Sequence, residues 1–112
     1  MAPRAAITGA SRDGLRLAVD GAPRFVPWRH IESVLAGMIG APAGVLFVLV
    51  VEYAANRTAL IIETEPVWAE LTEMLHIGLP DVEPFSAWGA RLGVQPDVIT
   101  LYKRASPAVG LA

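Results

Sequence analysis

Hydrophobic and polar residues alternate in short stretches over the first part of this chain. Leu15, Leu17 and Val19 are separated by polar or small residues, and this period of two predicts a half-exposed strand. The sequence "DGAP" at residues 20–23 predicts a turn, after which "RFVPW" continues in extended form, with Pro27 marking an edge or the end of pairing. We therefore expect a first hairpin over about residues 15–28.

The residues that follow favour further strands. A short turn at Trp28–Ile31 is expected to lead into a strand, although "IESVLAGM" also fits a helical stripe. The sequence "GMIGAPAG" is rich in Gly and Pro and is expected to form a loop. Val45–Tyr53 and Thr58–Thr64 flank "AANR" and are rich in β-branched and aromatic residues, so they predict a second hairpin with its turn at 55–57.

The spacing of apolar residues becomes helical after Thr64. We expect a helix over about residues 66–77, capped by Thr64 or Glu65 and ended by Gly78 and Pro80. Its apolar stripe consists of Val67, Trp68, Leu71, Met74 and Leu75.

A second, shorter helix is predicted after Pro84, where Phe85, Trp88 and Leu92 repeat at helical spacing. The later "VITLYKR" predicts a strand that rejoins the sheet. Because the strands cluster before the helices, the order favours an antiparallel α+β domain over an alternating α/β one. We assign this single domain to residues 1–104, and expect 105–112 to be a tail that is loosely held or lodged on a neighbouring molecule.

Composition points to a protein partner. The chain has 112 residues, enough for one domain, and is 54% hydrophobic but only 18% charged, so its surface should carry more apolar area than usual. A second copy of the chain is the simplest partner for that area. The net charge is −2 and the arginines are scattered singly, so we expect no nucleic-acid partner.

Other classes are also disfavoured. The absence of cysteine excludes disulfides, thiolate catalysis and cysteine-ligated metals. The run "VLFVLVV" at Val45–Val51 is far shorter than the roughly 20 residues of a membrane-spanning helix and indicates a buried strand. No apolar signal core follows "MAPR", so we expect a cytoplasmic protein.

The stretch "ITGASRDG" at residues 7–14 looks like the phosphate loop of a short-chain dehydrogenase. That loop needs a buried strand before it and further glycines four and six residues after Gly9, where this chain has Asp13 and Leu15. The Tyr-x-x-x-Lys pair of those enzymes is also missing, since Arg57 follows Tyr53 at that spacing. We therefore expect a turn between two short strands, with Leu15 and Leu17 facing the core and no bound cofactor.

A family resemblance becomes visible over about residues 15–104. The segments "FVPWRHIESVLA", "VLFVLVVEYAANRTALIIET", "EPVWAELTEMLHIGLPDV", "FSAWGARL" and "TLYKR" resemble the small bacterial pleckstrin-homology-like proteins of unknown function. The resemblance implies a strongly bent antiparallel sheet or partly open barrel with one main packed helix and a second short one. It implies no catalytic residue and no ligand. Pleckstrin-homology domains that bind inositol phosphates have basic residues in the first hairpin loop, whereas "DGAP" here is acidic or neutral, so lipid headgroup binding is not expected.

Candidate chemistry is sparse. In an extended backbone His30 and Glu32 would share a face, so that the carboxylate could orient the imidazole, but no nucleophile stands at a known spacing, and surface polar residues are the simpler interpretation. His76 is expected to meet the dipole and last carbonyls of the main helix. A metal site from His30 and His76 would need Glu32 or Glu73 as well, and no spacing supports it.

The remaining polar and aromatic candidates have structural interpretations. We expect Glu63, Glu65, Glu70 and Glu73 to favour the helix dipole or face water. Trp68 and Trp88 are expected in the core, which leaves Trp28 as the one candidate for an exposed aromatic anchor.

Two hypotheses follow. The first is a non-catalytic protein-interaction or scaffold module that self-associates through an apolar sheet face or an edge strand, with Trp28, Arg29, His30 and Glu32 as candidate contacts. The alternative is a small ligand-binding protein or enzyme with a pocket between the sheet and the main helix, using His30, Glu32 or His76.

Overall fold

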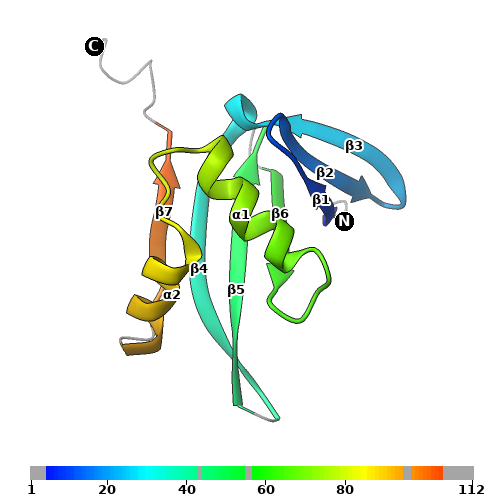
Figure 1. Cartoon of the computed structure of the whole chain (residues 1–112). Helices are drawn as coiled ribbons and strands as arrows, with labels where there is room; N and C mark the ends of the chain where they lie inside the picture. The colour runs from blue at the N-terminus through cyan, green and yellow to red at the C-terminus, as the bar shows by residue number, and fades with distance from the viewer. Residues whose placement is uncertain (1–4, 43, 55–56, 95–96, 105–112) are drawn as a thin grey trace, which may run out of the picture.

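The computed structural model describes residues 5–42, 44–54, 57–94 and 97–104, and its strands form two antiparallel sheets (Figure 1). The first sheet has the order β1 (Ala5–Ala10), β2 (Gly14–Val19), β3 (Ala22–Pro27). The second has the order β6 (Arg57–Ile62), β5 (Gly44–Tyr53), β4 (Ile31–Ala41), β7 (Ile99–Lys103). A 3₁₀ turn, η1 (Trp28–His30), joins β3 to β4, and the helices α1 (Trp68–Gly78) and α2 (Phe85–Val94) precede β7. The expected antiparallel α+β class is confirmed.

The strands do not form the single bent sheet that was expected. β1 lies beside β6, but no ladder joins them, and the described strands close no barrel. The division falls at η1, because Pro27 ends β3 and the 3₁₀ turn redirects the chain before β4 begins. The second sheet therefore has β6 and β7 at its edges.

The first hairpin is confirmed in its position, and the structure shows its turn type. Asp20 (φ 52°) and Gly21 (φ 85°) both adopt left-handed backbone conformations between β2 and β3. Two consecutive positive φ values are the mark of a type I′ turn, which suits the twist of a two-residue hairpin. The predicted turn between two short strands in "ITGASRDG" is also confirmed, since β1 pairs with β2 across residues 11–13.

The loop predicted for "GMIGAPAG" is wrong. β4 continues to Ala41 and pairs with β5 from Gly44, with Met38 opposite Phe47 and Gly40 opposite Val45. Pairing with the apolar β5 overrides the local preference of the glycines, and Pro42 stands in the turn, where its missing N–H costs no ladder bond. The second predicted hairpin is confirmed as β5 and β6, while Asn56 of its turn lies outside the described residues.

The predicted caps of the main helix are wrong, although its position is nearly right. α1 begins at Trp68, with Val67 at the N-cap and no side-chain cap bond. Glu65 accepts the N–H of Ile62 through its carboxylate (2.9 Å) and the N–H of Trp68 through its carbonyl (3.0 Å), so it shapes the turn before the helix. α2 and β7 are confirmed, and the predicted tail 105–112 lies outside the described residues.

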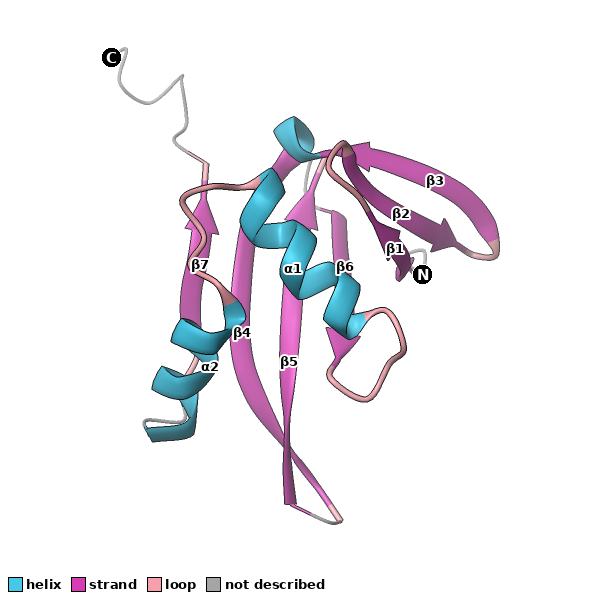
Figure 2. Ribbon diagram, in the orientation of Figure 1, coloured by secondary structure: helices cyan, strands magenta, loops and turns pink. Residues whose placement is uncertain are grey.

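The core lies on one face of the second sheet, where both helices pack (Figure 2). This cluster includes Leu49 and Val51 of β5 and Leu71 and Leu75 of α1, and all four are fully buried. Leu15 and Leu17 join the same cluster from the first sheet, as expected. Trp68 and Trp88 are buried in it with edge-to-face aromatic neighbours, so their predicted core positions are confirmed.

Candidate functional site

The strand register of the second sheet separates two different faces. Val34 and Ala36 of β4 pair with Val51 and Leu49 and belong to the core. Because side chains alternate along a strand, their neighbours in β4 and β5 point the other way, as do the matching residues of β6. We call the aliphatic part of that second side the open face; it consists of Leu35, Ile39, Leu46, Val48, Val50, Leu60 and Ile62.

The open face stands apart from the core. Among the described residues none of its members belongs to the core cluster, and even Val48, 8% exposed, is absent from it. Leu60 is 49% exposed and Ile39 is 38% exposed. In the described part of the chain both helices lie on the opposite side of the sheet (Figure 2). Leu35, Leu46, Val50 and Ile62 are partly exposed, and apolar area in contact with water is unfavourable in proportion to its size.

Charge is confined to one end of this side of the sheet. The chain has no charged residue between Glu32 and Glu52. Ser33 of β4 pairs with Glu52 of β5 on one side and with Lys103 of β7 on the other. Glu52 in turn pairs with Thr58 of β6. We call these four residues the polar row. The Ser33 hydroxyl donates a hydrogen bond to the Glu52 carboxylate, which holds that carboxylate over β4.

One edge of the first sheet, strand β3, carries two prolines. Pro23 and Pro27 of β3 pair with Ala18 and Gly14, and neither has an N–H to donate. Of the outward-facing backbone positions of β3, only Phe25 between them offers a donor. Proline at an edge strand blocks pairing with another chain, so the β3 edge is a poor template for strand addition.

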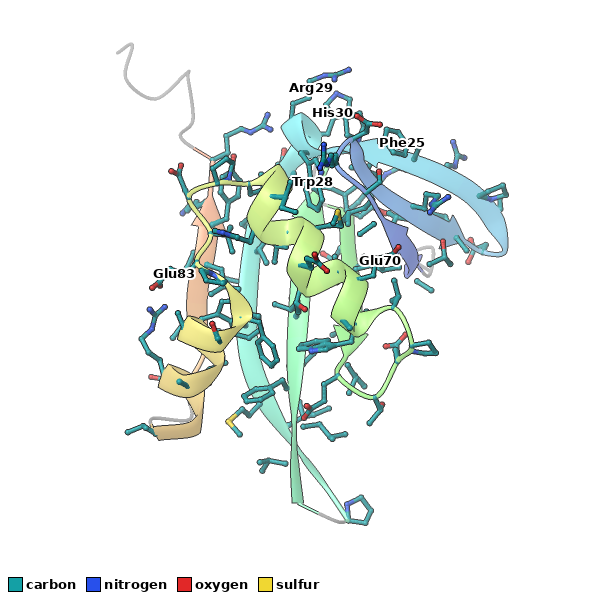
Figure 3. All side chains as sticks on the ribbon, in the orientation of Figure 1. Phe25, Trp28, Arg29, His30, Glu70 and Glu83 are labelled. Carbon is teal, nitrogen blue, oxygen red and sulfur yellow. The ribbon has the colours of Figure 1, made fainter. Side chains whose placement is uncertain are left out.

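Trp28 is not the exposed anchor that was expected. Its side chain is 6% exposed, and its Nε1 donates a hydrogen bond to the carbonyl of Ser11 (2.9 Å). The η1 turn directs the ring inward against α1, where it meets Gly78. Arg29 and His30 of the same turn are exposed at the end of the molecule (Figure 3).

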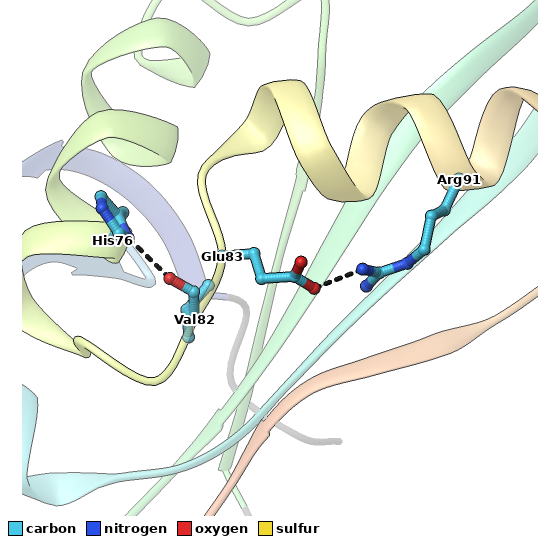
Figure 4. Close-up of polar contacts among 4 residues, drawn as sticks. All are labelled: His76, Val82, Glu83 and Arg91. Atoms are coloured by element: carbon cyan, nitrogen blue, oxygen red, sulfur yellow. Dashed lines mark hydrogen bonds and ion pairs between the residues drawn. The ribbon is translucent and has the colours of Figure 1, made fainter.

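His30 and Glu32 are both exposed, as the simpler interpretation of surface polar residues has it, and they do not have the extended spacing that would place them on one face. His30 belongs to the 3₁₀ turn, and Glu32 stands at the irregularity in β4 between Ile31 and Ser33, so the extended spacing does not apply. His76 lies in the last turn of α1, as expected, but its Nδ1 lies 2.7 Å from the carbonyl of Val82 in the loop beyond the helix (Figure 4). The same loop carries Glu83, which pairs with Arg91 of α2. The described contacts join none of His30, Glu32 and His76 to one another.

The acidic cluster around α1 is mainly structural. The Glu63 carboxylate accepts the N–H of Phe47 (2.9 Å), while the N–H of Glu63 donates to the carbonyl of Phe47 (3.0 Å). The Glu65 carboxylate accepts the N–H of Ile62, and the N–H of Glu65 donates to the carbonyl of Ile62. The N–H of Ala10 donates to Glu70 Oε2 (3.4 Å). Three of the four glutamates therefore bind backbone groups rather than only facing water, and Glu73 is exposed.

Further features of the described residues add no chemical site. They include no group of three or more His, Cys, Asp and Glu side chains that could hold a metal ion. An open hollow of about 370 Å³ is lined by small residues of β1 and β2 and by Asp20 and Gly21. Neither described helix has the length and apolar character to cross a membrane. No protein-family model, curated protein or solved structure matches the chain.

The sequence did not predict which residues make up the open face, because that depends on how the strands pair. The available signal was the uncharged run between Glu32 and Glu52. That run contains both core-facing and outward-facing positions, and a loop prediction at "GMIGAPAG" hid half of the hairpin.

Proposed function

We propose that this protein is a non-catalytic interaction module that associates with a second copy of itself through the open face. The observation that carries the proposal is an aliphatic sheet surface outside the core, in a chain that is 54% hydrophobic. Burial of such a surface against another is favourable by roughly 25 cal/mol per Å² of apolar area, before the costs of association.

The size of the surface supports a weak dimer. Four strands about 4.8 Å apart, over the roughly 20 Å from Ser33 to Ile39, give a footprint of about 400 Å². Two copies would then bury about 800 Å² in total, which is below the roughly 1,200–2,000 Å² of stable interfaces and in the range of weak, transient ones. We therefore expect association at high micromolar concentration.

A second copy fits the open face better than other occupants. The face has no charge at its centre, and its polar row carries one anion and one cation, Glu52 and Lys103. A lipid headgroup or a nucleic acid would require an excess of positive charge. A flat aliphatic sheet packs well on an identical sheet, about 10 Å away.

The earlier alternative, a ligand pocket or an active site, receives less support. Its residues His30, Glu32 and His76 are exposed, and no described hydrogen bond or ion pair joins them. Arg29 and His30 remain candidate contacts for a further partner, since both side chains are exposed on η1. The pleckstrin-homology-like identification also remains a proposal, supported by the segments quoted above and by antiparallel strands with a packed helix.

Analytical ultracentrifugation over a concentration series tests the proposed function. The wild type should form a dimer at high micromolar concentration, and Leu60→Lys should be monomeric because it places a charge in the open face. Ile77→Lys is the matched control: Ile77 is 43% exposed on α1, away from this face, and the variant should dimerise like the wild type. A wild type that stays monomeric, or equal dimerisation of the two variants, contradicts the proposal.

A further inference from the structure

We propose that two copies pack with their strands running in the same direction, so that Glu52 of one copy pairs with Lys103 of the partner subunit. This inference rests on the proposed self-association and adds its geometry. It follows from the uneven distribution of charge along the open side of the second sheet.

The two ends of that side differ in polarity. At one end lies the polar row, with Ser33, Glu52 and Lys103 in three adjacent strands. At the other end Ile39 of β4 pairs with Leu46 of β5, near the turn of the hairpin. The hydrogen bond from Ser33 keeps the Glu52 carboxylate on this side, and Lys103 is exposed.

Two-fold symmetry allows two simple face-to-face arrangements. If the axis runs across the strands, the polar row of each copy lies on Ile39 and Leu46 of the other. That arrangement buries Glu52 and Lys103 against aliphatic side chains with no opposite charge beside them, which is unfavourable. If the axis runs along the strands, the polar row meets the polar row and the aliphatic residues meet each other. The second arrangement is therefore favoured.

The strand order then determines which charges meet. Because the order is β6-β5-β4-β7, rotation about an axis along the strands places β7 over the partner's β6 and β5 over the partner's β4. Lys103 consequently lies over Thr58 of the partner subunit, one strand from Glu52 of the partner subunit. Long side chains of opposite charge can bridge a sheet separation of about 10 Å. Symmetry produces this pair twice in each dimer.

Charge reversal tests the arrangement. Glu52→Lys alone brings two positive rows together, and Lys103→Glu alone brings two negative rows together, so each variant should dimerise roughly tenfold more weakly than the wild type. An equimolar mixture of the two variants places a positive row on a negative row and should form heterodimers at least as tight as the wild type. Ultracentrifugation with one variant fluorescently labelled measures both.

Controls separate this geometry from the proposed function. Glu73→Lys makes the same charge change on α1 and should leave dimerisation unchanged. Glu52→Gln keeps an acceptor for Ser33, and its dimer should depend less on salt than the wild type, which tests the pair without charge reversal. If the mixture associates no better than its components while Leu60→Lys is still monomeric, self-association stands and this geometry is wrong. If the wild type is monomeric, both proposals are wrong.

Discussion

The indole of Trp28 lies directly against Gly78, so closely that a Cβ at residue 78 would stand 2.1 Å from Trp28 Cε2. This contact joins the η1 turn to the last turn of α1. The same indole donates to Ser11 between β1 and β2. One side chain therefore connects the first sheet, the turn between the two sheets and the main helix.

Gly78→Ala should destabilise the protein by about 1–3 kcal/mol, because the added methyl group must displace a packed indole. Gly93→Ala is the matched control, since a Cβ at residue 93 in α2 meets nothing within 4 Å. That control should be neutral or stabilising by up to about 1 kcal/mol through helix propensity. Urea unfolding followed by circular dichroism measures both free energies, and equal values would contradict the packing described here.

Trp28→Phe should cost about 1–2 kcal/mol more than Trp68→Phe. Both substitutions remove a similar volume from buried positions, 6% and 7% exposed. Only Trp28 loses a hydrogen bond, to the carbonyl of Ser11, whereas Nε1 of Trp68 is buried without a partner. The difference in unfolding free energy between the two variants checks this expectation, and a larger loss for Trp68→Phe would refute it.

Gly14→Ala should destabilise the first sheet by about 3 kcal/mol, since the new Cβ would stand 2.2 Å from the backbone oxygen of Val26. Gly9→Ala should cost less than about 1 kcal/mol, because its nearest neighbour is the flexible, exposed side chain of Arg16. Thermal unfolding of the pair is the measurement. Comparable losses would show that the two glycines of "ITGASRDG" have similar packing roles.

Glu63→Ala should leave the Phe47 N–H without its acceptor, at the point where β5 extends beyond its pairing with β6, because the substitution removes the carboxylate. We expect a loss of about 1 kcal/mol and faster hydrogen exchange of the Phe47 amide. Glu63→Gln retains a side-chain acceptor and should protect that amide nearly as well as the wild type. Unchanged exchange of the Phe47 amide in Glu63→Ala would mean that the Glu63 carboxylate does not protect this amide.

Much of the fold could be predicted because its signals are local. The alternation at Leu15 and Leu17 and the turn at Asp20 place β2 and β3, and the stripe through Trp68 places α1. The long β4–β5 hairpin was only half predicted, since Gly37 and Gly40 favour a loop by themselves. Pairing with the apolar β5, a contact between distant positions, determines their conformation.

The candidate site was less accessible to sequence reasoning. Composition raised the hypothesis of an apolar interaction face, but which residues lie on each face of the sheet depends on register, which the sequence does not specify. Trp28 illustrates the same limit. A tryptophan between Pro27 and Arg29 looks exposed in the sequence, and only the 3₁₀ turn directs it inward.

The pairing of β7 with β4 also has a consequence for the order of folding. β4 and β5 are neighbours in sequence, so their hairpin can form early, whereas the other edge of β4 must wait for residues 99–103. Until those residues leave the ribosome, β4 presents an unpaired edge beside an aliphatic face. We therefore expect the nascent chain to be most prone to aggregate after β5 has been synthesised and before β7 can pair with β4.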